Sequence, residues 1–254
     1  MDKGRDSQLK NWKLTGIRCV SLIIFCLMCC HRAYAEEKSF AVVELFTSEG
    51  CSSCPPADQI LIQLTDKAKG DKRNIFTLSF HVDYWNDLGW RDPFSRSQFT
   101  DRQYEYARRL NSTSVYTPQI LVNGKVSQLT QIEEDIDHAL TMTRALPMRI
   151  AIQNQTPKEL QIEYELSEMI AGGILHLALV ERGLSNVVTR GENAGRTLKH
   201  DHVVRFFSSR DLTEEKGTMT IPLSALWDLK NCSIIVYVQN AQTMKILTAH
   251  MIDL

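Results

Sequence analysis

A pair of cysteines, Cys51 and Cys54, stands where an apolar run gives way to a helical pattern. Residues 41–46 are mostly apolar and β-branched, as in a buried strand, whereas residues 57–64 have helical character. Two cysteines at this spacing on a strand-to-helix junction are typical of a redox site, because the amides and dipole of a helix N-terminus stabilise a thiolate. A plain structural disulfide and half of a zinc site are the alternatives, and zinc would require a second Cys or His pair at ligand spacing.

Residues 1–35 have the features of a removable signal peptide. A basic stretch precedes a short apolar run over residues 19–30, and Ala33 and Ala35 form a small-residue cleavage site. The run is short for a membrane span, so an uncleaved anchor is the less favoured alternative. We therefore expect an exported protein, periplasmic or secreted, with no stable membrane insertion after cleavage.

Cleavage would change the charge and the cysteine count. Residues 1–35 hold six of the 29 basic residues, two of the 30 acidic residues and four of the seven cysteines, which leaves a net charge of −5. This charge gives no indication of nucleic-acid binding. In an oxidising compartment a Cys51–Cys54 disulfide would persist. Cys232 lies beside an apolar, strand-like run, and we expect it to be buried and inert.

The pattern of the remaining chain changes near Leu146–Pro147. Over residues 36–146 it predicts strand, helix, strand, helix, strand, strand and helix, with a tight hairpin at Asn123–Gly124. Over residues 147–254 it predicts about seven short strands, which is typical of a sandwich. These strands are expected at 149–153, 160–166, 175–180, 203–207, 219–221, 234–238 and 246–252. We therefore expect two domains.

The order of elements, the Cys51-Ser-Ser-Cys54 motif and Thr117-Pro118 before the third strand resemble thioredoxin-like proteins. Most of the chain more closely resembles the secreted thioredoxin-like bacterial proteins of domain-of-unknown-function family 1223. The segments that carry this resemblance are 43–58, 79–85, 88–93, 115–119 and 190–196. The resemblance implies an α/β thioredoxin-like domain followed by a smaller β-rich, sandwich-like domain. It also implies a cis peptide bond before Pro118, which would face the cysteine pair.

The loop after the second predicted strand carries further candidate residues. The first two strands should be parallel, so His81, Asp83 and Trp85 should lie on the same rim as Cys51 and Cys54. We expect His81 or Asp83 to transfer a proton during disulfide exchange, or alternatively to fix the loop by hydrogen bonds. Trp85 belongs to an aromatic group that either lines a peptide groove or, as we favour, packs against the loop. The other members are Tyr84, Trp90 and Phe94.

A polar stretch over residues 189–202 is the last candidate region. Arg190 and Arg196 have the chemistry to bind a carboxylate through two hydrogen bonds each. His200 and His202 alternate along an incipient strand, which predicts that both point to one face. A histidine with the cysteine pair would suit copper(I), whereas a solvated face or a domain interface is the favoured interpretation. In a further interpretation the stretch folds over the cysteine rim and gates access.

These features together predict thiol–disulfide exchange with an extracytoplasmic protein or a small-molecule thiol. Cys51 would be the accessible nucleophile and Cys54 would resolve the mixed disulfide. Thr117 and Pro118 would shape the substrate groove, with Trp85 beside them. We expect no cofactor and no metal, because the cysteine pair itself carries the electrons. The alternatives are a non-catalytic binding module with a structural Cys51–Cys54 disulfide, and a copper(I) carrier.

Overall fold

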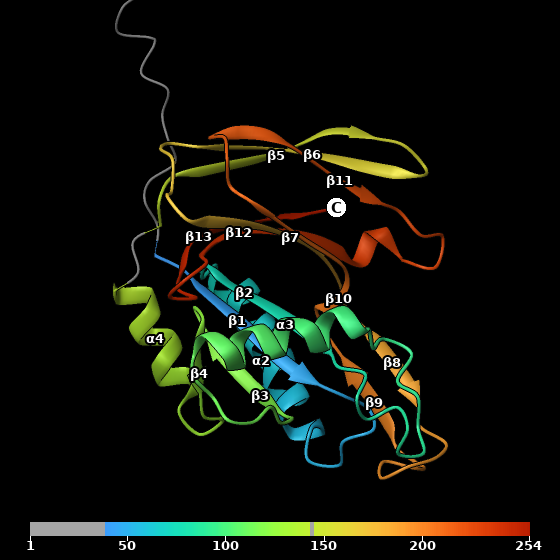
Figure 1. Ribbon diagram of the computed structural model, residues 1–254. Helices are drawn as coiled ribbons and strands as arrows, with labels where there is room; N and C mark the ends of the chain where they lie inside the picture. The colour runs from blue at the N-terminus through green and yellow to red at the C-terminus, as the bar shows by residue number, and fades with distance from the viewer. Residues whose placement is uncertain (1–38, 143–144) are drawn as a thin grey trace, which may run out of the picture. The chain divides into compact units, whose positions relative to one another are not determined.

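Eight strands form one mixed sheet in the order β13-β12-β7-β10-β2-β1-β3-β4 (Figure 1). The computed structural model describes residues 39–142 and 145–254, so the predicted signal peptide over residues 1–35 lies outside the described residues. The strands of the large sheet are β1 (Ala41–Thr47), β2 (Ile75–His81), β3 (Gln119–Val122), β4 (Lys125–Ser127), β7 (Gly173–Glu181), β10 (Val203–Asp211), β12 (Cys232–Asn240) and β13 (Ile246–Asp253).

The parallel pair β1 and β2 lies inside the large sheet, between β10 and β3, and every residue of both strands is buried. Continuous burial is expected where both faces of a strand are covered. Val42 and Phe46 of β1 pack into one core cluster, whereas Ala41, Val43 and Leu45 pack into a second cluster on the opposite face. This alternation follows from the two-residue period of a strand.

Three helices accompany the sheet in the described residues. They are α2 (Pro55–Asp71), α3 (Ser97–Arg109) and α4 (Ile132–Met142). α2 and α4 bury apolar residues in the cluster that contains Ala41, and α3 buries Phe99 and Tyr106 in the cluster that contains Phe46. None of the described helices is long and apolar enough to cross a membrane.

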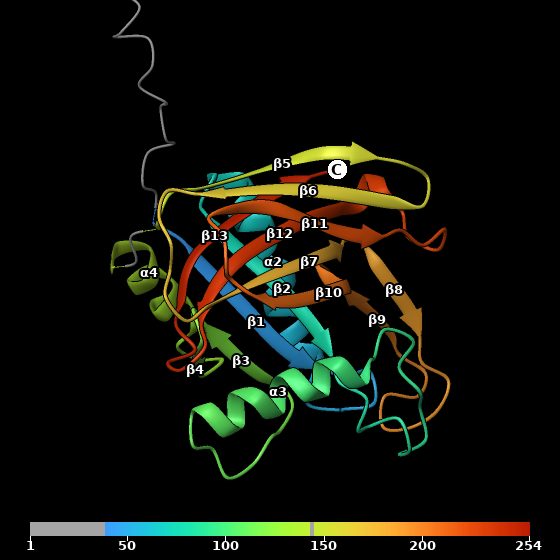
Figure 2. The same cartoon turned by 45° about the horizontal axis from the view of Figure 1, so that its top comes forward.

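A second, three-stranded sheet has the order β11-β6-β5 and lies over the β7, β12 and β13 end of the large sheet (Figure 2). Its strands are β5 (Met148–Gln155), β6 (Glu159–Leu166) and β11 (Lys216–Pro222). Alternate residues of β6 are buried, so one face of this small sheet closes a hydrophobic cluster against β7 and β12. A separate hairpin pairs β8 (Leu184–Val187) with β9 (Thr197–His200), and a short 3₁₀ turn, η1 (Leu229–Asn231), precedes β12.

The predicted fold class, an α/β thioredoxin-like domain followed by a smaller β-rich domain, is wrong. The described chain is mostly β structure, and strands from both sides of Leu146–Pro147 belong to the same large sheet. The two sets of strands meet where β10 lies parallel to β2, with Val203 opposite Ser79. The backbone amide of Ser79 donates to the carbonyl of His202 at 2.9 Å, so the edge of β2 that faces away from β1 is paired.

Individual elements agree better with the sequence than the fold class does. All seven strands expected after residue 147 are present, and Asn123 and Gly124 form the predicted turn between β3 and β4 with φ values of 47° and 85°. Two positive φ values are what a two-residue hairpin turn requires. The peptide bond between Thr117 and Pro118 is cis.

Candidate functional site

The Cys51–Cys54 disulfide lies between the end of β1 and the start of α2, with its Cα atoms 5.5 Å apart. Cys54 is the N-cap residue of α2, and Pro55 is the first residue of the helix, as the sequence predicts. Both cysteines are 0 % exposed, whereas Ser52 and Ser53 between them are exposed. The expectation that Cys51 is the more accessible sulfur is therefore wrong for this state of the protein.

A loop from the second half of the chain, residues 188–196, lies against the backbone of the segment that carries the disulfide; we call it the covering loop. The side-chain amide of Asn193 donates two hydrogen bonds of 2.9 Å, to the backbone carbonyls of Glu49 and Cys51. The backbone amide of Ser52 donates to the carboxylate of Glu192 at 3.0 Å. Asn193 is itself fully buried, so the loop seals the backbone around the cysteine pair.

The covering loop is held in place from two sides. Arg196 Nη1 donates to Asn193 Oδ1 at 2.8 Å, which turns the NH₂ group of that amide toward the cysteine loop. Gly191 lies against the loop that follows β2, where a Cβ atom on Gly89 would come within 3.3 Å of the Gly191 Cα. Gly191 has a φ of +73°, and a Cβ there would lie 3.1 Å from the Cβ of Trp90. Glycine is required because the two loops touch through their backbones.

Five ionisable side chains form a buried cluster near the cysteine pair. His81 Nδ1 lies 2.7 Å from Asp92 Oδ2, and His200 Nε2 lies 3.2 Å from Glu49 Oε1. The two imidazole rings are 4.8 Å apart, and His200 Nδ1 is 3.9 Å from a carboxylate oxygen of Asp58. The cluster joins residues from β2, α2, β9 and two loops, so it is assembled from segments far apart in the sequence.

Three polar atoms of this cluster have no hydrogen-bond partner. They are Asp58 Oδ1, His81 Nε2 and His200 Nδ1, all of them buried. Buried polar atoms are normally paired, because leaving one unpaired costs about 1–3 kcal/mol. Within the ranges that the structure describes, no group of three or more His, Cys, Asp or Glu side chains is arranged to hold a metal ion. The cluster combines carboxyl and imidazole groups, the side chains most often used in acid–base chemistry.

Burial and mutual charge shift the pKa values within the cluster. Burial raises the pKa of Asp58 above its ordinary value, even though the facing imidazoles of His200 and His81 act in the opposite direction. Burial alone would lower the pKa of His81, but the charges of Asp92, Asp58 and Glu49 outweigh it and raise that pKa. For Asp92 the effect of burial is outweighed by His81 and by hydrogen bonds, so the pKa of Asp92 is lowered.

The sequence matches one family model, described as a protein of unknown function (DUF1223), over residues 42–239. The chain belongs to the DUF1223 family. No curated protein matches it.

Among solved structures, the DUF1223 chain is similar to a protein from Agrobacterium tumefaciens determined by X-ray crystallography. The two sequences are 30% identical, the match covers 86% of this chain and 96% of that one, and the TM-score is 0.62. A domain of the outer membrane lipoprotein Omp28 from Porphyromonas gingivalis is 12% identical over 44% of this chain and 93% of that one, with a TM-score of 0.26. A β-glucuronidase from Ruminococcus gnavus is 8% identical over 42% of this chain and 15% of that one, with a TM-score of 0.24. The last two similarities are too low to support a conclusion about this chain.

The structure separates the predicted site residues of this DUF1223 protein into two groups. His81 belongs to the buried cluster, as described above. Asp83 instead accepts a hydrogen bond of 2.6 Å from Thr100 Oγ1 and so fixes the loop to the start of α3. Trp85 Nε1 donates to Thr117 Oγ1 at 2.8 Å, and its Cβ lies 3.0 Å from where a Cβ on Gly50 would be. Trp85 and Thr117 therefore lie beside the cysteine loop.

The remaining aromatic side chains make packing contacts. Phe94 has its ring 5.3 Å from that of His81 and 5.7 Å from that of His200. Trp90 donates from its indole to Glu49 Oε2 at 2.8 Å. Phe94 and Trp90 therefore pack around the buried cluster.

His200 and His202 do not share a face. His202 has a φ of +47°, which ends the strand pattern, and its Nδ1 atom lies 2.7 Å from the hydroxyl of Thr77. Arg190 is exposed, whereas Arg196 is engaged with Asn193. Thus only His200 of this histidine pair belongs to the buried cluster.

Sequence reasoning missed Glu49, Asp58, Asp92 and Asn193 as members of the site. Asp58 carried a usable signal, because it follows Cys54 by four residues in the predicted helix and must lie on the same face. Asn193 lies in the 189–202 stretch, which in one interpretation folds over the cysteine rim, but its own contacts and those of Asp92 could not be predicted because they depend on how distant loops meet.

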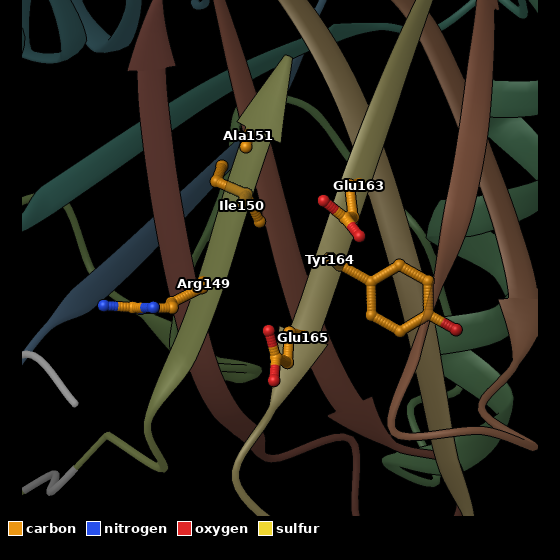
Figure 3. A pocket seen from close by; sticks show the side chains of 6 residues that line it. All are labelled: Arg149, Ile150, Ala151, Glu163, Tyr164 and Glu165. Atoms are coloured by element: carbon orange, nitrogen blue, oxygen red, sulfur yellow. The ribbon is translucent and has the colours of Figure 1, made fainter. Parts of the chain in front are cut away.

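A hollow of about 310 Å³ lies at β5 and β6 of the small sheet, and Figure 3 shows the side chains that line it. Its lining residues are Arg149, Ile150, Ala151, Glu163, Tyr164 and Glu165. Lys216 forms an ion pair with Glu163 at 2.8 Å. The charges of the hollow are thus engaged within the small sheet.

Cys232 is buried, and its Sγ atom lies 3.3 Å from the carbonyl of Asp228. Burial raises the pKa of its thiol to about 12. A thiol with so high a pKa is a poor nucleophile near neutral pH, so the prediction of an inert cysteine is consistent with this environment.

Proposed function

We propose that this DUF1223 protein carries out thiol–disulfide exchange through Cys51 and Cys54, with an extracytoplasmic protein or a small-molecule thiol as partner. The observation that carries the proposal is the position of Cys54, at the N-cap of α2 and one helical turn from the buried carboxyl of Asp58. A disulfide that only cross-links the chain does not need buried acids and imidazoles beside it, and burying them is costly. Such groups are typical of sites where protons move.

In the proposed reaction a partner thiolate attacks the sulfur of Cys51. A mixed disulfide forms, the Cys51–Cys54 bond breaks, and Cys54 leaves as a thiolate. A second partner thiolate attacks the partner's sulfur in the mixed disulfide and releases Cys51 as a thiolate. The two partner thiols lose two electrons and become a disulfide, the cysteine pair gains those electrons, and two protons convert its thiolates to thiols. The reverse sequence reduces the partner and uses the same atoms.

The position of each cysteine supports this assignment of roles. Cys54 lies at the helix N-cap, where the dipole stabilises a thiolate, and a stabilised thiolate leaves faster. Cys51 lies three residues earlier, beyond the turn over which the dipole acts. Cys51 is therefore the proposed point of attack, and Cys54 the leaving or resolving group.

The covering loop has to move before a partner can reach Cys51, which is 0 % exposed. Asn193 donates two of the hydrogen bonds that hold the loop to the cysteine segment, and Glu192 accepts a third. Hydrogen bonds of this kind contribute about 0.5–1.5 kcal/mol each. Opening them is within reach of the free energy released when a partner binds. We propose that this movement gates the exchange.

The proposed partner groove lies along Trp85, Thr117 and Pro118. Trp85 and Thr117 are half-buried and hydrogen-bonded to one another, so they offer an apolar surface with a fixed shape. Arg190 is exposed on the covering loop and has the chemistry to bind a partner carboxylate. Arg196 serves the site by orienting Asn193, and Asp83 serves it by fixing the loop.

The reduction potential of the Cys51–Cys54 pair, measured by equilibration with glutathione buffers, tests the proposal. A value between about −270 and −120 mV would place the pair among working oxidoreductases. A value below about −300 mV would overturn the proposal, because a bond that stable resists exchange with cellular thiols. The variant Cys232→Ser is the matched control, since removing the inert thiol should leave the potential unchanged.

A structural disulfide in a binding module is the second candidate, and the complete burial of both cysteines favours it. The two candidates differ in the effect of reduction. If the bond is structural, its role is to stabilise the folded protein. The double variant Cys51→Ser, Cys54→Ser should then lower the melting temperature, and the wild type should show no thiol–disulfide exchange activity for the variant to lose. The copper(I) alternative requires ligands that the described residues do not present as a group.

A further inference from the structure

Asp58 and Cys54 lie on one face of α2. The backbone amide of Asp58 donates to the carbonyl of Cys54 at 3.1 Å, and Cys54 itself has helical dihedral angles of −77° and −38°. Side chains four residues apart in a helix are neighbours, with Cβ atoms about 5–6 Å apart. The carboxyl of Asp58 is therefore placed one turn behind the sulfur of Cys54.

The carboxyl of Asp58 is largely withdrawn from solvent. Asp58 is 5 % exposed, and its Oδ1 atom has no hydrogen-bond partner. The ionisable groups that face it are His200 of β9, His81 of β2 and Asp92 of the loop after β2, with the hydroxyl of Thr47 at the end of β1. Glu49 is hydrogen-bonded to the imidazole of His200. The charges and hydrogen bonds of these groups act on the carboxyl of Asp58.

Because the disulfide is buried, the thiolate formed when it opens needs a proton donor inside the protein. When the S–S bond breaks, the leaving sulfur of Cys54 gains a negative charge in a place that bulk water does not reach. An isolated charge in such a place is strongly unfavourable. A protonated carboxyl one turn away removes that charge by giving up a proton to the sulfur.

We propose that Asp58 is the internal proton donor of this site, giving its proton to Cys54 as the disulfide opens, with His200 as the positioning residue that sets when Asp58 is protonated. The inference rests on the proposed thiol–disulfide exchange and deepens it. The O–H bond of Asp58 breaks, an S–H bond forms on Cys54, and the electrons remain those supplied by the partner thiolate. In the reverse direction the thiol of Cys54 returns the proton to Asp58.

The electrostatics of the cluster suit this role. Burial raises the pKa of Asp58, so the carboxyl holds its proton at a higher pH than an exposed aspartate does. The unpartnered Nδ1 atom of His200 lies 3.9 Å from Asp58 Oδ2, and Glu49 fixes the other nitrogen of the ring. The charge of His200 lowers the pKa of Asp58, which limits how strongly the proton is held.

The test is the rate of reduction of the full chain by dithiothreitol, divided by the concentration of the dithiothreitol thiolate, from about pH 5 to pH 9. In the wild type this rate should fall by about 100-fold as the pH rises through the pKa of Asp58, because a positioned proton donor contributes about 10²–10⁴-fold. In Asp58→Asn, which preserves the shape of the side chain, the rate should be low and independent of pH.

Asp66→Asn is the matched control, because Asp66 is an exposed aspartate on the same helix. It should behave as the wild type does. His200→Asn is the second variant, and it should move the fall in rate to higher pH, because the charge that lowers the pKa of Asp58 is gone. A shift of this kind is not expected from a residue that only packs.

The outcomes distinguish the inference from the function on which it rests. If Asp58→Asn is reduced at the wild-type rate with the wild-type pH profile, the internal proton donor is overturned and thiol–disulfide exchange stands. If the wild-type disulfide resists dithiothreitol at every pH, both fall together. If Asp58→Asn does not fold, the pH shift in His200→Asn decides, and an unshifted profile overturns the inference.

Discussion

Arg102 of α3 donates two hydrogen bonds, from Nε at 2.8 Å and from Nη2 at 2.6 Å, to the same carboxylate oxygen of Glu44 on β1. Both residues are buried, and the guanidinium lies within 6 Å of four aromatic rings. These rings belong to Phe80, Tyr106, Phe207 and Tyr237. The pair therefore ties α3 to the centre of the sheet and to strands from the other half of the chain.

Replacing Arg102 by Met should lower the free energy of unfolding by about 3–5 kcal/mol, because it leaves the charge of Glu44 buried without a partner. Chemical denaturation monitored by circular dichroism measures this change. Arg108→Met is the control, since Arg108 is exposed on the same helix and its replacement should stay within about 0.5 kcal/mol. Equal effects of the two substitutions would show that Arg102 does not act through Glu44.

Asp92→Asn should destabilise the protein most in the pH interval over which the pair with His81 is charged. The pKa of Asp92 is lowered in the folded protein, so its contribution is lost as the pH falls through that folded value. The pKa of His81 is raised, so its contribution is lost as the pH rises through that folded value. Between the two values the cost of the substitution should be about 3 kcal/mol.

Melting temperatures of the wild type and Asp92→Asn across this pH range provide the measurement. The exposed Asp87 of the same loop supplies the control Asp87→Asn, which should follow the wild type. A constant difference between wild type and Asp92→Asn at all pH values would speak against the charged pair.

Local patterns predicted most of the strands and helices, because each depends on a short stretch of sequence. The runs that became β1 and β2 are apolar and β-branched, and Asn123-Gly124 has the dihedral preferences of a tight turn. The pairing of β2 with β10 has no such local signature. This pairing depends on contacts between strands that are far apart in the sequence. It joins strands from the two expected domains in one sheet.

The site divides in the same way. The rim shared by Cys51, Cys54 and His81 followed from the parallel arrangement of β1 and β2, which holds. The contributions of Asn193 and His200 depend on the covering loop, which one interpretation of residues 189–202 placed over the cysteine rim, and on the β8–β9 hairpin, which was not predicted. An alternating H-x-H pattern could not show that a positive φ at His202 would separate the two histidines.

Gly124→Ala should be among the most destabilising glycine substitutions, because a Cβ atom there would overlap the backbone carbonyl of Met244. Gly172→Ala isolates the backbone component: Gly172 also has a positive φ, +67°, but a Cβ there would meet nothing within 4 Å. We expect Gly172→Ala to cost about 1 kcal/mol and Gly124→Ala clearly more. Thermal unfolding of both variants measures the difference, and equal costs would refute the close contact.

Asn193→Ala should accelerate reduction of the disulfide by about 10-fold, because it removes two of the three hydrogen bonds described between the covering loop and the cysteine segment. Reaction with dithiothreitol, followed by labelling of the released thiols, gives the rate. Thr189→Ala changes an exposed residue of the same loop and should leave the rate unaltered. If Asn193→Ala is reduced no faster than Thr189→Ala, the loop is not what restricts access.

The distance along the chain between the cysteines and their cover sets an order of events during synthesis. Asn193 follows Cys51 by 142 residues, and His200 follows Glu49 by 151. A growing chain therefore presents both sulfur atoms to any oxidant or thiol long before the residues that enclose them have been added. The disulfide can therefore form while Cys51 and Cys54 are still accessible. The residues that bury it, in the last third of the chain, are added afterwards.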